Sequence, residues 1–140
     1  MLSEYKHIES IRFGKSFNRS IEYVSSNKLL RHITFSWKFN QAIKHLPHYI
    51  YLEQIIFSGE FNQSLECLSI CTKLEHPVLS FWYDKSINFL AHCVYLKHIM
   101  SGYKFSQLID VMSLCPMINQ IHCQQNFDVS SSIKKTIIGF

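Results

Sequence analysis

The sequence contains little glycine and proline, with only four and three of them among 140 residues. This scarcity excludes collagen-like and low-complexity chains. No apolar run reaches the roughly 18 residues of a membrane-spanning helix, so we expect none. The first residues, MLSEYKHIE, lack the apolar core of a signal peptide. We therefore expect a cytoplasmic protein without a signal peptide.

Catalytic and nucleotide-binding motifs are also absent. The chain has no glycine-rich phosphate loop, Walker pattern, G-x-S-x-G or H-E-x-x-H. Its carboxylates are scattered, without a pair suited to acid–base chemistry. We therefore expect no enzyme activity and no cofactor.

The five cysteines are an odd number, so no disulfide scheme uses all of them. Without an export signal, reduced thiols are the simplest interpretation. Cys71, Cys93 and Cys115 follow one another at equal, long intervals. Zinc needs four converging ligands, usually with cysteine pairs two to four positions apart. We interpret the three thiols as buried packing residues and predict no metal site.

The chain does contain a 22-residue repeat. FNRSIEYVS, FNQAIKHLP and FNQSLECLS begin at equal intervals, and further steps of the same length reach an aromatic residue each time. No insertion or deletion breaks this register, which excludes chance. We expect the rings to stack in the core, and the small polar residue after each ring to bond to backbone at a turn. The aromatic positions are Phe17, Phe39, Phe61, Tyr83, Phe105 and Phe127.

One unit can be written L-x-x-I-x-F-x-x-x-F-N-x-x-I-x-x-L-P. The alternating I-x-F part is typical of a strand with one buried face, and such short strands need identical neighbours to be stable. The pattern predicts an α/β-type or mostly β solenoid, a leucine-rich-repeat-like stack of about six coils with one short parallel sheet. We expect one array over 1–140, with units at roughly 8–29, 30–51, 52–73, 74–95, 96–117 and 118–140.

The stretches FNQAI-x-x-LP and FNQSL-x-x-L resemble the FNIP repeat, a leucine-rich-repeat relative of social amoebae and of giant viruses that infect amoebae. The resemblance extends from about Ile8 to Phe127, although Tyr83-Asp84 and Phe105-Ser106 replace Phe-Asn in later copies. It implies a solenoid with an interaction role and no enzyme activity. It also implies the host cytoplasm if the chain is viral.

Some viral relatives carry an F-box ahead of the repeats, which makes the array the substrate-recognition arm of a ubiquitin ligase. Leu2 and Ile8 already fall in register with the repeat, so we expect no F-box here. The chain starts and stops inside a repeat, and open solenoid ends predict end-to-end self-association or poor solubility.

Alternation predicts the open face of the sheet. If Ile33 and Phe35 point inward, their neighbours point to solvent, in each copy alike. Horseshoe-shaped repeats usually bind partners there, and a plain hydrated face is the alternative. The candidate partner-binding residues are His32, Thr34, Ser36, Gln54, Ile56, Ser58, His76, Val78, Ser80, His98, Met100, Gln120 and His122.

Two departures from the pattern stand out. Pro77 occupies a position that is isoleucine in the neighbouring copies, and it predicts a kink or a lost hydrogen bond in the sheet. Trp37, Phe81 and Tyr103 share a position just past the strand that alternation turns inward, with Trp82 beside it. If exposed, these aromatic residues would be natural interface anchors.

These observations favour a non-enzymatic scaffold that binds an unknown protein partner on the concave sheet face. A nucleic-acid binder is the first alternative, because residues 1–50 carry eight Lys or Arg against three Asp or Glu, within a net charge of +4. Lys and Arg do not share one repeat position, as a phosphate track would require. A truncated repeat copy without a defined role is the second alternative.

Overall fold

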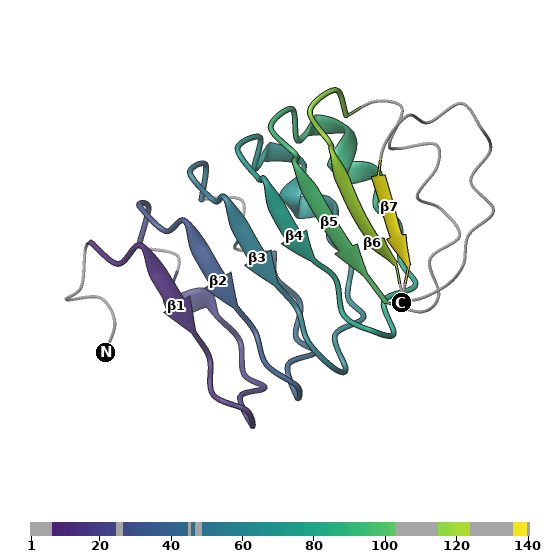
Figure 1. Ribbon diagram of the computed structural model, residues 1–140. Coiled ribbons are helices and arrows are strands. Elements are labelled where there is room, and N and C mark those ends of the chain that lie inside the picture. The colour runs from purple at the N-terminus through teal and green to yellow at the C-terminus, as the bar shows by residue number, and fades with distance from the viewer. Residues whose placement is uncertain are drawn as a thin grey trace.

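In the computed structural model, residues 7–24, 27–44, 46, 49–102, 115–123 and 136–139 are described. Their strands form one parallel sheet of seven strands in chain order (Figure 1). The first six strands begin at equal intervals along the chain, one in each repeat, which confirms the predicted solenoid. The strands are β1 (Ser10–Arg12), β2 (His32–Thr34), β3 (Gln54–Ile56), β4 (His76–Val78), β5 (His98–Ser101), β6 (Gln120–Cys123) and β7 (Thr136–Gly139).

Short 3-10 helices lie on the return path between strands. Figure 1 shows these turns behind the sheet, so each coil passes from a strand in front to an arc at the back. The described helices are η2 (Glu22–Val24), η4 (Glu66–Ile70) and η5 (Asn88–His92). None of the helices in the described ranges is long and apolar enough to cross a membrane.

The last strand departs from the period of the repeat. His98 of β5 pairs with Gln120 of β6, but Gln120 in turn pairs with Thr136 of β7, so the final coil is shorter than the one before it. The repeat predicts about six coils and not this strand, because β7 follows β6 at a shorter interval than the repeat period. The predicted ring positions Phe105 and Phe127 lie outside the described residues.

The core contains a double row of stacked rings. Phe39, Phe61 and Tyr83 succeed one another with ring centroids 5.9 and 6.3 Å apart. A second row, through Phe35 and Phe57, has a spacing of 5.1 Å and contacts the first row within each coil. The predicted stacking is therefore confirmed for the ring positions that the structure describes. Since each ring rests on its counterpart one coil away, identical residues pack against one another along the array.

The cysteine position of the repeat is also part of the core. Cys71, Cys93 and Cys115 are at most 1% exposed, as are Asn27 and Tyr49 at the same position in earlier coils. Burial raises the pKa of the Cys71 and Cys93 thiols to about 12. At neutral pH these two thiols are protonated, so they are poor nucleophiles. This confirms the prediction that they are packing residues.

Asparagine side chains connect successive coils. The Oδ1 atom of Asn18 accepts a hydrogen bond from the backbone N–H of Asn40, and Oδ1 of Asn40 accepts one from Asn62, both at 3.0 Å. The next link, from Asp84 N–H to Asn62 Oδ1, is 3.1 Å long. The expected side-chain to backbone bond is therefore present, and it joins one coil to the next. Neighbouring coils are thus held together by side chains as well as by the sheet.

We expect Asn40→Ala to lower the free energy of unfolding by about 1–2 kcal/mol. The change removes the acceptor of Asn62 N–H and also that of the Gln63 side-chain amide, 3.1 Å away. Urea unfolding followed by circular dichroism measures the loss. The exposed Asn88→Ala is the control, and an equal effect of both changes would contradict the role of the ladder.

Candidate partner-binding face

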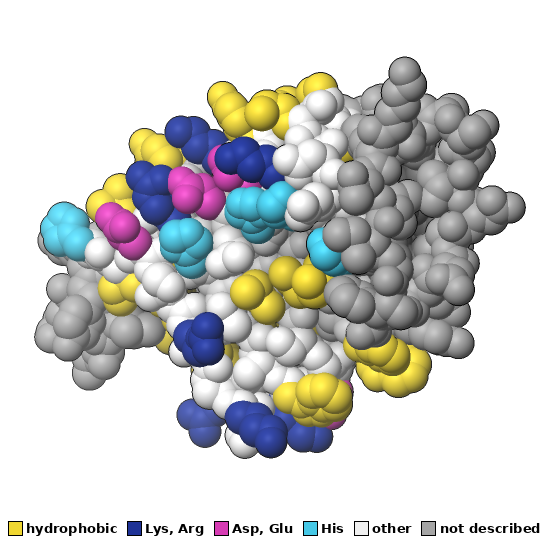
Figure 2. Space-filling model, viewed as in Figure 1, with side chains coloured by type: hydrophobic (Ala, Val, Ile, Leu, Met, Phe, Trp, Pro, Cys, Tyr) yellow, Lys and Arg dark blue, Asp and Glu magenta, His cyan; other side chains and the backbone are white. Residues whose placement is uncertain are grey.

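The sheet presents one face to the core and the other to solvent. Ile33, Ile55, Pro77, Ile99 and Ile121 are buried, whereas the residues on either side of them in each strand are not. The 3-10 helices lie behind the sheet, so the front of Figure 1 is its open face. Figure 2 shows this face, with histidine side chains above a small group of hydrophobic ones.

Parallel register aligns the outward side chains in columns. His32, Gln54 and His76 pair in sequence across β2, β3 and β4, and His98 pairs with Gln120. A central column runs beside them from Thr34 through Ile56, Val78 and Met100 to His122. All of these residues are half-buried except Met100, which is 44% exposed. The face is thus a polar column of imidazoles and amides beside an apolar centre.

Ser80 is not on this face. The strand prediction placed it there with Ser36 and Ser58, which are half-buried, but Ser80 is only 1% exposed. Its hydroxyl donates a hydrogen bond to the carbonyl oxygen of Phe61. Ser80 lies beyond the end of strand β4 at Val78, and there this bond to the preceding coil turns its side chain inward. The prediction for Ser80 was therefore wrong.

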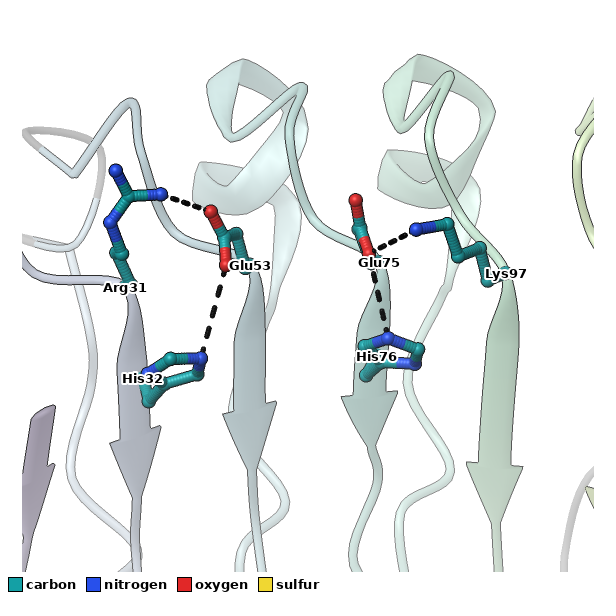
Figure 3. A network of polar contacts seen from close by, with 6 residues as sticks. All are labelled: Arg31, His32, Glu53, Glu75, His76 and Lys97. Carbon is teal, nitrogen blue, oxygen red and sulfur yellow. Dashed lines mark hydrogen bonds and ion pairs between the residues drawn. The ribbon is translucent and has the colours of Figure 1, made fainter.

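Paired charges border the histidine column at the start of the strands (Figure 3). Glu53 contacts the guanidinium of Arg31 and lies 3.9 Å from His32 Nε2. Sequence analysis missed these pairs, although a comparison of residues one repeat apart would have shown opposite charges. Exposed pairs of this kind contribute about 0–1 kcal/mol. Their effect is to leave this border without excess charge.

The same arrangement recurs at Glu75, which contacts Lys97 Nζ at 2.6 Å and His76 Nε2 at 3.5 Å. The rings of His76 and His98 have centroids 4.8 Å apart and planes tilted by 50°. Burial lowers the pKa of His76, and the neighbouring His98 lowers it further. Both effects favour the neutral form of His76 at neutral pH. In the described part of the chain, no three His, Cys, Asp or Glu side chains are grouped to hold a metal.

The aromatic residues beyond the strands are exposed. Trp37 and Trp82 are 52% and 50% exposed, and Phe81 is also at the surface. Strand alternation predicted that Trp37 and Phe81 point inward. This prediction is wrong, because the chain turns away from the sheet at these positions. Trp37 lies over Gly59, which has a positive φ of 59°. The fourth aromatic residue of this set, Tyr103, lies outside the described residues.

Comparison with solved structures identifies the architecture. An internalin, inlF, from Listeria monocytogenes superposes with a TM-score of 0.68 at 17% identity over 84% of this chain. The fold is a leucine-rich-repeat-like solenoid. The internalin C2, inlC2, of the same organism gives a TM-score of 0.66 at 11% identity over 86% of the chain.

This leucine-rich-repeat-like chain spans only 35% and 56% of the two internalins. The structural similarity is therefore limited to the part of each internalin that superposes on these coils. No family model matches the sequence. A comparison with curated proteins also finds no match.

Proposed function

We propose that this solenoid is a non-enzymatic scaffold that binds a protein partner on the open face of its sheet. The observation that carries the proposal is the central apolar stripe of Ile56, Val78 and Met100, which lies exposed or half-exposed between polar columns. An apolar centre with a polar border is the usual composition of a protein interface. The predicted polar face residues other than Ser80 supply the polar border.

Charge pairing is the reason to prefer a protein partner over nucleic acid. Arg31, Lys38 and Lys97 each contact a glutamate one coil away. Cations that are already paired bind phosphate weakly, because a phosphate would have to displace the carboxylate. The face therefore offers no continuous row of free cations among its described residues.

The FNIP-like motifs support a narrower proposal. In it, the chain is an FNIP-type array of an amoeba or of a giant virus, works in the cytoplasm, and serves as a substrate-recognition arm. Association of two arrays end to end is a further proposal, which sedimentation velocity would test.

The test of the proposed face is a triple change of Thr34, Ile56 and Val78 to glutamate. We expect the variant to lose binding by about 100-fold or more, because three charges would be buried without partners in the interface. The measurement is recovery of one stoichiometric protein by affinity purification from the native cell, with and without nuclease. Circular dichroism should show an unchanged fold.

A matched control carries three glutamates on the opposite side. Tyr23, Ile70 and Val94 lie on the arcs behind the sheet and are each about half exposed. Their replacement by glutamate should leave partner recovery unchanged. The proposal is wrong if the face variant still binds, or if nuclease removes every partner from the unmodified protein.

A further inference from the structure

The sheet lacks one hydrogen bond at Pro77. Backbone N–H groups alternate in direction along a parallel strand. Phe57 N–H donates to the Val78 carbonyl of the next strand, and Leu79 N–H donates to that of Met100, both at 2.8 Å. Residue 77 lies two positions before Leu79, so its N–H would point toward β5 as well. Proline has no N–H, which confirms the predicted lost hydrogen bond.

The pairing between β4 and β5 is correspondingly short. Only Val78 and Met100 pair across this joint. By contrast, β3 and β4 pair at three positions and β5 and β6 at four. Strand pairing is thus short on the β5 side of β4, toward which the N–H of residue 77 would point. On the β3 side, all three residues of β4 are paired.

A hollow of about 190 Å³ opens on the sheet face at this joint. Its walls include the side chains of His76, His98, Val78 and Met100, together with Pro77 and Ile99. The side chains of Pro77 and Ile99 point into the core. From the open face only their backbone can be reached, so the backbone of β4 and β5 forms the floor of the hollow.

The chemistry of the hollow favours an uncharged occupant. Among the described residues, no Lys, Arg, Asp or Glu lines it. Glu75, which lies 3.5 Å from Nε2 of His76, is paired with Lys97 at 2.6 Å. The lowered pKa of His76 favours the neutral form of this imidazole at pH 7. A cavity of about 150 Å³ is large enough for benzene, so this hollow has room for one branched aliphatic side chain or one ring.

We propose that the hollow between β4 and β5 is the anchor pocket of the partner-binding face, and that it takes one uncharged apolar side chain of the partner. The inference rests on the proposed function. Interfaces obtain most of their affinity from a few buried anchors in pockets near their centre. The hollow is lined by Val78 and Met100, two of the three residues of the apolar stripe. In this arrangement the sheet lacks one hydrogen bond at Pro77 and has a pocket at the same joint.

N-acetyl-leucinamide is a suitable probe, with N-acetyl-lysinamide and N-acetyl-aspartamide as charged counterparts. NMR of protein labelled at methionine methyl groups reports binding at Met100, and the exposed Met117 serves as internal control. We expect the leucine probe to shift the Met100 methyl signal with a Kd of about 1 mM, as befits so small a ligand. The charged probes should leave the signal unchanged.

Pro77→Ile supplies the decisive comparison, because isoleucine occupies this position in the neighbouring strands. Restoring the N–H should close the joint, raise the melting temperature and weaken leucine-probe binding at least about tenfold. Pro77→Ala restores the N–H with a smaller side chain and serves if isoleucine does not fit. Ile55→Val, one strand away, should leave probe binding unchanged.

The proposal is overturned if the lysine probe shifts Met100 as strongly as the leucine probe does. It is also overturned if both Pro77 variants fold and bind the leucine probe as tightly as the unmodified protein. A natural partner that is lost from the triple glutamate variant but kept by Pro77→Ile would leave the proposed function standing and reject the anchor pocket alone.

Discussion

Phe61→Ala should lower the free energy of unfolding by about 3–5 kcal/mol. Phe61 is 0% exposed, and its ring stacks on Phe57 at 3.9 Å and between Phe39 and Tyr83 at 5.9 and 6.3 Å. Truncation removes the burial energy of the ring and leaves a cavity that rigid neighbours cannot fill. A whole domain is stable by only about 5–15 kcal/mol, so the loss is a large part of the total.

Urea unfolding followed by tyrosine and tryptophan fluorescence measures this change. Phe81→Ala is the matched control, because the same side chain is exposed at that position, and it should cost well under about 1 kcal/mol. Similar losses for the two variants would show that the row of rings does not form the core.

Gly59→Ala should destabilise the protein by at least about 2 kcal/mol, since two separate effects oppose it. Gly59 has a φ of +59°, a conformation that costs a residue with a Cβ about 1–2 kcal/mol. In addition, the new Cβ would lie 2.5 Å from the carbonyl oxygen of Trp37 and 2.8 Å from its Cα. Both are backbone atoms of the preceding coil, so the two coils would have to separate.

Gly14→Ala provides the comparison. A Cβ at Gly14 would meet no atom within 4 Å, and its φ is not positive. Alanine there should be neutral or stabilise the protein by up to about 1 kcal/mol. Thermal unfolding of both variants by circular dichroism tests the pair. Equal melting temperatures would mean that the coil does not need the tight turn at Gly59.

The period alone accounts for most of the architecture. In a solenoid each residue lies over its counterpart one coil away, so a regular repeat predicts spatial neighbours as well as local structure. This is why the ring stack at Phe39 and Phe61, the buried thiols and the parallel order of the strands could all be predicted. Pro77 could be identified for the same reason, as a residue that departs from a column of isoleucines.

Sequence periodicity thus determined the coil length, the inward columns and the location of the open face. The tertiary structure alone decided what happens beyond the short paired segment of each strand. Ser80 turned inward, Trp37 turned outward, β7 paired after a shorter coil, and a hollow opened beside Pro77. The physical reason is that alternation governs side-chain direction only while a strand is paired, whereas its ends follow the backbone path that packing against neighbouring coils imposes.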